Sequence, residues 1–284
     1  QVRRDRRVGY KGGALREGLV QARGEFLAVF DADFEPPPDF LRRAIPHFAD
    51  AGIGMVQARW GHLNEGYSLL TRAQAVALDG HFLVEQTARN RSGAFMNFNG
   101  TAGIWRRSAI LDAGDWQDDT LTEDLDLSYR AQLAGWRFLF LPDLVCPAEL
   151  PAEVNGFKGQ QFRWAKGSAQ TALKLLPRIW RAPHGLFVKL QATIHLTNHF
   201  VYPLLVGVAL LSFPALRIYA TEAAARPAFA WATLLVVASL GHPVLYLYAQ
   251  SRIRRDWYRQ VPMIPVMIAL GMGMLLALTR RRQG

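Results

Sequence analysis

Two carboxylates follow a short apolar segment near the start of the chain. Asp31 and Asp33 flank a single alanine and come directly after the apolar run FLAVF at 26–30. Such a run predicts a buried strand, and open α/β sheets bind ligands at the carboxyl ends of their strands. Mg²⁺ takes one or two protein carboxylates and completes its shell with phosphate oxygens and water. The pair therefore predicts a site for Mg²⁺ or Mn²⁺ and a diphosphate; the alternative is a solvated acidic turn.

A second acidic segment, TLTEDLD, spans residues 120–126. Thr120 and Glu123 have the spacing of a helix capping box, which is a purely structural use. A capping box does not require Asp124, and an acid at this place could serve as general base toward a hydroxyl group. Both interpretations remain open from the residues alone. Asp126 either supports Asp124 or is simply negative charge in the first turn of the helix, and we favour the second interpretation.

The third segment is QQFRW at residues 160–164. The Arg163 guanidinium can form forked hydrogen bonds to a diphosphate, and Trp164 offers a flat apolar face on which a sugar ring can stack. The alternative is an amphipathic helix lying on a bilayer, with Trp164 and Lys166 as interfacial anchors. The two interpretations are compatible, because a synthase that secretes its product needs a site at the membrane surface.

In this order the segments resemble the processive members of glycosyltransferase family 2, the cellulose-synthase superfamily, whose pattern includes D-x-D, T-E-D and Q-x-x-R-W. The T-E-D motif matches Thr122, Glu123 and Asp124. The segment KGGAL from Lys11 resembles the family's K-A-G-A-L. Residues 56–60 (VQARW) and 98–106 (FNGTAGIWR) are most similar to the glucomannan and xyloglucan-backbone branch and its bacterial relatives.

The resemblance implies a GT-A fold, inverting chemistry and a divalent metal, Mg²⁺ or Mn²⁺. It implies that Asp33 binds the metal, that Asp31 contacts the nucleotide or the metal's shell, and that Asp124 deprotonates the acceptor hydroxyl. Thr122 and Glu123 complete the catalytic motif. Three side chains are expected to hold the diphosphate: Lys11, Gln160 and Arg163. Four residues are expected to contact the acceptor: Trp164, Asn99, Gly100 and Thr101.

The elements that must position these residues alternate along the chain. We expect helices at 11–23, 39–49, 69–89 and 123–133, and strands at 26–30, 54–60 and 137–141. Strands alternating with helices predict an α/β domain with a mostly parallel sheet. We therefore expect a partial GT-A domain at 1–150, interfacial amphipathic helices at 151–190, and transmembrane helices at 191–284.

Three charge-poor blocks, at 197–216, 227–250 and 261–279, are each close to the roughly 20 residues of a membrane-spanning helix. Buried helices of a large soluble core are the alternative. Four arginines lie between the second and third blocks: Arg252, Arg254, Arg255 and Arg259. Positive loops stay in the cytoplasm, so we expect an integral protein of the bacterial inner membrane with a cytoplasmic catalytic domain. That placement accounts for the net charge of +10 without a nucleic-acid partner.

The expected function is transfer of a hexose from UDP-glucose or GDP-mannose to a growing β-linked polysaccharide, with export of the product across the bilayer. Two alternatives remain: a non-processive transferase that acts on a lipid-linked acceptor, and an inactive membrane scaffold. The family's first strand and first aspartate would precede Lys11 and are absent from this sequence. We therefore expect a fragment that is incomplete at its N-terminus and inactive as given.

Overall fold

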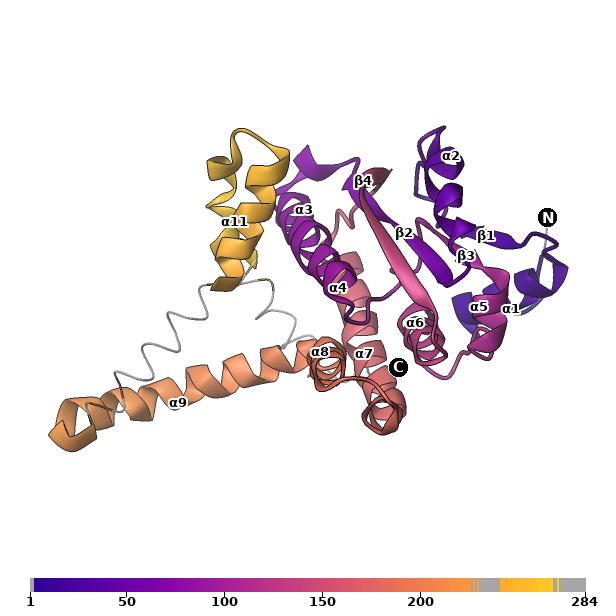
Figure 1. Ribbon diagram of the computed structural model, residues 1–284. Helices are drawn as coiled ribbons and strands as arrows, with labels where there is room; N and C mark the ends of the chain where they lie inside the picture. The colour runs from indigo at the N-terminus through magenta and orange to yellow at the C-terminus, as the bar shows by residue number, and fades with distance from the viewer. Residues whose placement is uncertain (1–2, 226, 228, 230–240, 268–269, 271–284) are drawn as a thin grey trace.

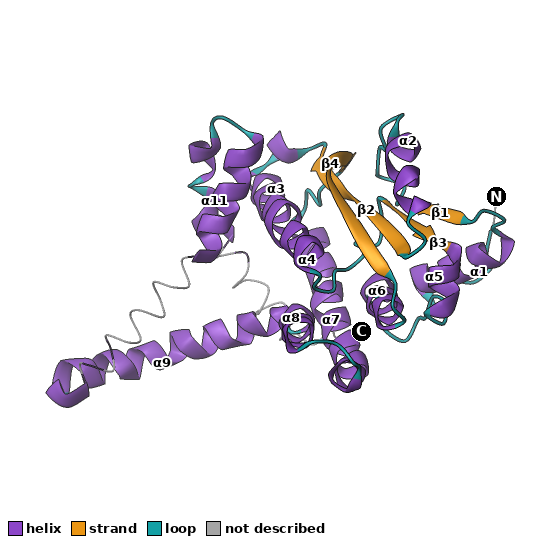
Figure 2. Cartoon of the chain, viewed as in Figure 1, coloured by secondary structure: helices purple, strands orange, loops and turns teal. Residues whose placement is uncertain are grey.

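The computed structural model describes residues 3–225, 227, 229, 241–267 and 270 of the 284. Four strands form one sheet in the order β1-β3-β2-β4 (Figure 1). Their bounds are β1 Phe26–Val29, β2 Ile53–His62, β3 Gly103–Arg106 and β4 Arg137–Ala148. Helices flank this sheet, as Figure 2 shows by colour, and the long helix α9 (Val201–Thr221) extends away from it.

The prediction of a mostly parallel sheet is wrong. β3 pairs antiparallel with both β1 and β2, and only β2 and β4 are parallel. The extended segment before β3 explains this, because the Met96 and Phe98 amides donate to Gln132 and Ser128. This segment leads to Thr101, which meets the carboxyl end of β1 at Asp31. From there β3 can only run back antiparallel to its neighbours.

Alternate residues of the strands fill two cores on opposite faces of the sheet. Met55 and Trp105 belong to one core, and their neighbours Val56 and Ile104 belong to the other. Helices α1 (Tyr10–Gln21), α5 (Arg107–Asp112) and α6 (Glu123–Leu133) contribute to the first core. Helix α2 (Phe40–Ala44) and the following 3₁₀ turn, η1 (Ile45–Ala49), close the second.

Most helix predictions are confirmed, with α1 and α6 within two residues of their expected ends. The expected long helix at 69–89 is three consecutive pieces: α3 (Leu69–Gly80), the π-helix η3 (His81–Gln86) and α4 (Thr87–Ser92). A third apolar core joins α6 to α7 (Val154–Arg181) and α8 (Leu186–Leu196). The helix that carries Gln160–Trp164 is therefore packed directly on the helix that begins with Glu123 and Asp124.

The first charge-poor block is helical and includes most of α9. Much of the second block and most of the third lie outside the described residues. Among the described residues, none of the helices is both long and apolar enough to span a membrane.

Helix α11 (Gly241–Ile253) lies beside α3 (Figure 1). Buried polar groups join the two: Gln250 Nε2 donates to Asp79 Oδ2 over 2.9 Å, and Asp79 also faces His62 Nε2 at 3.1 Å. Just after α11, Arg254 pairs with Glu65 at 2.7 Å. The arginine loop, which carries Arg254, Arg255 and Arg259 after α11, is thus attached to the domain that contains the sheet.

Candidate active site

The turn after β1 holds the first two candidate residues. The Asp31 amide donates to Thr101 Oγ1 over 2.8 Å, which ties this turn to the loop before β3. The Asp31 carboxylate forms an ion pair with the Lys11 ammonium from α1. The Asp33 side chain is exposed to solvent. The expected metal residues and Lys11 therefore lie together at the carboxyl end of β1.

Gly100 brings the candidate base to the same place. A Cβ atom on Gly100 would lie 2.9 Å from Asp124 Oδ2 and 3.6 Å from Lys11 Nζ. The backbone of Gly100 has φ +83°, in the left-handed region that favours glycine. Asp124, Lys11 and the Asn99–Thr101 loop thus surround one point, although they come from three distant parts of the sequence.

The environment of Asp124 suits a proton acceptor. Burial, followed by the charge of Glu123, raises the pKa of Asp124 to about 7. Burial also raises the pKa of Glu123, whose aliphatic stem packs against Gly12 of α1. A carboxylate with a pKa close to the working pH is well matched to general base catalysis.

The capping box predicted from Thr120 and Glu123 is wrong, because Thr120 is not at the N-cap. Helix α6 begins at Glu123 with Thr122 at its N-cap, and the Thr122 side chain makes no capping hydrogen bond. Its hydroxyl instead lies 3.4 Å from the Thr171 hydroxyl of α7. Packing against α7, rather than local capping, sets where this helix starts.

Helix α7, which carries Gln160, Arg163 and Trp164, contacts the start of α6. Gly167, one turn after Arg163, lies against Thr122 so closely that a methyl group there would overlap the threonine side chain and lie 2.8 Å from its amide nitrogen. Gln160 and Trp164 are half-buried and Arg163 is exposed. These three side chains therefore lie one to two helical turns from the contact with Thr122.

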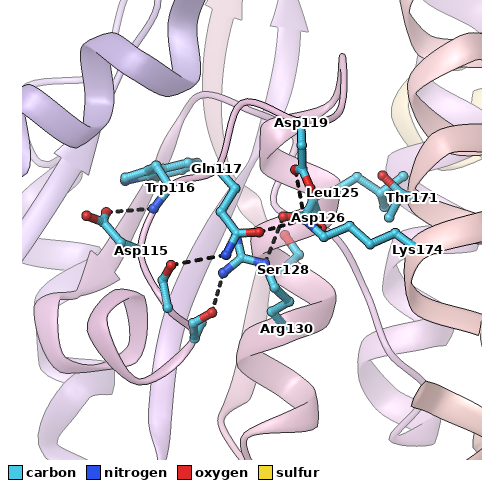
Figure 3. Close-up of polar contacts among 12 residues, drawn as sticks. Asp115, Trp116, Gln117, Asp119, Leu125, Asp126, Ser128, Arg130, Thr171 and Lys174 are labelled. Atoms are coloured by element: carbon cyan, nitrogen blue, oxygen red, sulfur yellow. Dashed lines mark hydrogen bonds and ion pairs between the residues drawn. The ribbon is translucent and has the colours of Figure 1, made fainter. Parts of the chain in front are cut away.

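A buried ionic cluster fixes the two helices to each other (Figure 3). The Asp126 carboxylate is fully buried and pairs with Arg130 at 2.8 Å and with Lys174 of α7 at 2.9 Å. The Lys174 ammonium also donates to Gln117 Oε1 over 2.6 Å and to Asp119 Oδ1 over 2.8 Å. Asp126 is therefore the centre of an interhelical cluster, and its interpretation as first-turn helix charge misses that role.

Sequence reasoning also missed the residues that hold the loop before β3. Gln57 is fully buried. Its side-chain Nε2 donates to the Thr101 and Ala102 carbonyls, and its Oε1 accepts from the backbone N–H of Asn99. Gln57 lies within the VQARW segment singled out above, so a polar residue inside a buried strand was the available signal.

Asp31 and Asp33 fit a divalent metal that shares its coordination with a substrate diphosphate. Among the described residues, no group of three or more His, Cys, Asp and Glu side chains forms a metal cage. Two carboxylates are nonetheless the usual protein contribution to a Mg²⁺ site completed by phosphate oxygens and water. Lys11, which pairs with Asp31, adds a positive charge next to such a site.

Comparisons with known proteins show the family of this chain. A family model described as "Glycosyl transferase family group 2" matches residues 26–275. Glucomannan 4-beta-mannosyltransferase 2 of Arabidopsis thaliana is 50% identical over 182 residues, which are 63% of this chain and 34% of that protein. Glucomannan 4-beta-mannosyltransferase 1 of Oryza sativa subsp. japonica is 43% identical over 230 residues, 76% of this chain and 44% of that protein. The chain thus spans less than half of these relatives.

Among solved structures, the mannosyltransferase PcManGT from Pyrobaculum calidifontis, in complex with GDP-Man and Mn²⁺, has a similar fold. The TM-score is 0.54 at 19% identity, and the match covers 99% of this chain and 68% of that one.

Proposed function

The chain belongs to glycosyltransferase family 2, in its cellulose-synthase-like branch, with the GT-A fold, and we propose that it carries the acceptor-activating half of an inverting mannosyltransferase site. The donor is GDP-mannose and the acceptor is the end of a growing β-linked polysaccharide. The observation that carries this proposal is the position of Asp124, half-buried with its pKa raised to about 7, against Gly100 and beside Lys11.

In the proposed reaction a hydroxyl of the acceptor sugar attacks the anomeric carbon of the donor. The new glycosidic bond forms as the bond to the diphosphate breaks on the opposite face, and the configuration inverts. Asp124 takes the proton of the attacking hydroxyl, and the diphosphate leaves with the electrons of the broken bond. Lys11 and Arg163 offer cations to the leaving diphosphate, and Trp164 offers its ring to the acceptor.

Asp31 and Asp33 would hold Mg²⁺ or Mn²⁺. When bound, such an ion neutralises charge that develops on the leaving diphosphate. Mannose as the transferred sugar is favoured by the names of the relatives, which are mannosyltransferases. The neighbouring solved structure, which holds GDP-Man and Mn²⁺, supports the same choice of donor and metal.

We further propose that the protein acts at a bacterial inner membrane, with residues 1–190 in the cytoplasm, and exports its product. Four large apolar residues of α8 are exposed and suit a lipid surface: Leu186, Phe187, Leu190 and Ile194. The attachment of Arg254 to Glu65 supports an arginine loop on the same side as the catalytic domain.

The test uses membrane vesicles from cells that express the complete gene carrying this sequence. Radiolabelled GDP-mannose, UDP-glucose and GDP-glucose are offered separately with Mg²⁺ or Mn²⁺, and the product is sized and digested with mannanase or cellulase. We expect a long, mannanase-sensitive polymer from GDP-mannose, lost on chelation of the metal and in Asp124→Asn. A cellulase-sensitive polymer from UDP-glucose would contradict the donor. Short lipid-soluble products would favour the lipid-acceptor alternative, and no incorporation would favour an inactive scaffold.

A further inference from the structure

A chain of side-chain hydrogen bonds ends at Asn99, the residue before Gly100. Gln86 Nε2 donates to Asn99 Oδ1 over 3.1 Å, and Asn99 Nδ2 lies 3.2 Å from His81 Nε2. The other nitrogen of His81, Nδ1, lies 3.0 Å from Glu85 Oε2. Both ends of the Asn99 amide are therefore held by side chains of the π-helix η3.

These contacts fix the direction of every hydrogen bond in the chain. Asn99 Oδ1 accepts from Gln86, so its Nδ2 must donate to His81 Nε2. An imidazole nitrogen that accepts is unprotonated, so the proton lies on Nδ1 and is donated to Glu85. Arg89 donates to the other oxygen of Glu85 over 3.1 Å. Although burial disfavours the charge, the hydrogen bond from His81 and the positive charge of Arg89 lower the pKa of Glu85, which keeps it an acceptor.

The π-helix makes this arrangement possible. In an α-helix, residues five apart point about 140° away from each other, so His81 and Gln86 could not both reach one amide. The wider turn of η3 brings both to the same side. Single π turns within helices are rare and occur frequently at functional sites.

Asn99 retains bonding capacity that these contacts do not use. Its second N–H and the second lone pair of its Oδ1 stay available, and the residue is half-buried beside the point where Gly100 meets Asp124. A sugar hydroxyl, which both donates and accepts, matches this pair of groups.

We propose that His81, fixed by Glu85, is a positioning residue that orients the Asn99 amide to bind a hydroxyl of the acceptor sugar next to Asp124. The inference rests on the proposed function and adds a determinant of acceptor binding to it. His81 does not touch the reacting atoms; it acts through Asn99.

The test measures equilibrium binding of β-1,4-mannotetraose to the purified full-length protein in nanodiscs, without donor, so that no turnover is needed. Loss of one orienting hydrogen bond predicts about tenfold weaker binding by His81→Phe, which keeps a flat ring but has no acceptor. His81→Gln, whose Oε1 can accept from Asn99, should stay within about threefold of the natural protein. His47→Phe, the same substitution at an exposed site in η1, is the control and should bind normally.

Binding of GDP to each variant, measured in the same nanodiscs, separates positioning from folding. We expect all variants to bind GDP as the natural protein does. Unchanged mannotetraose binding by His81→Phe would overturn the inference, as would absence of binding by the natural protein. Loss of GDP and mannotetraose binding together would show a general structural role and would also overturn it. Normal mannotetraose binding without transfer from any donor would instead refute the proposed function and leave this inference standing.

Discussion

Replacing Asp124 with asparagine should stabilise the folded protein at neutral pH while abolishing transfer. The carboxylate is costly to ionise in its half-buried place next to Glu123, and this cost raises its pKa to about 7. Asparagine keeps an oxygen that can accept from the Leu125 amide, as Asp124 Oδ1 does over 2.8 Å. The substitution therefore removes the charge and the proton acceptor but preserves the local hydrogen bond.

The size of the effect follows from the pKa. The folded-state pKa of about 7 lies above the ordinary value of 3.8, so the protonated carboxyl contributes stability that is fully present below 3.8. That contribution is lost as the pH rises through 7. At about 1.4 kcal/mol per unit of pKa, ionisation of Asp124 lowers the free energy of unfolding by at most about 4 kcal/mol at pH 8. The free energy of unfolding of the Asp124→Asn variant should therefore exceed that of the natural protein by up to about 4 kcal/mol at pH 8, and by close to nothing at pH 4.

The assay is thermal unfolding of both proteins in nanodiscs between pH 4 and pH 8, together with transfer from GDP-mannose. We expect the difference in Tm to grow with pH while the variant shows no transfer. Asp118→Asn removes an exposed carboxylate from the preceding loop and controls for net charge. A difference in Tm that does not change with pH, or a variant less stable than the natural protein at pH 8, would refute the reasoning.

Three further predictions concern helices α6 and α7. Gly167→Ala should lower kcat about 100-fold, because its methyl group displaces α7 from Thr122; an unchanged kcat would contradict this. Lys174→Met should cost about 3 kcal/mol in chemical unfolding, because it breaks a buried ion pair with Asp126, whereas exposed Lys166→Met should stay within about 0.5 kcal/mol. Glu123→Gln removes a charge that raises the pKa of Asp124, so the acid limb of the kcat profile should move to lower pH.

The sequence predicts what depends on neighbours along the chain. The helix at 123–133 matches α6, and the apolar run before Asp31 is β1. Both rest on local periodicity and burial, which a short window contains. The three motifs are also local, so their residues could be selected before their arrangement was known.

The direction of β3, in contrast, depends on contacts between distant parts of the sequence. It depends on the segment at 94–99, whose amides bond to Ser128 and Gln132 on α6. Those partners lie about thirty residues further along the chain, and polar side chains that bond a distant backbone carry no periodic signal. The capping-box prediction failed because α6 begins at Glu123, which leaves Thr122 and not Thr120 at the N-cap, and the Thr122 hydroxyl lies against Thr171 of α7.

The Lys174 cluster shows why such contacts matter for the chemistry. The Asp126 carboxylate lies only two residues after Asp124 on the same helix, and it pairs with Lys174 of α7. Lys174 binds this carboxylate and, through Gln117 and Asp119, the loop that leads into α6. Lys174 and Trp164 share α7, so this ammonium group is one of the contacts that hold the helix of the candidate base against the helix of the candidate acceptor platform. A shift of either helix would move both partners of the reaction relative to each other, so we expect this cluster to control kcat even though it touches no substrate.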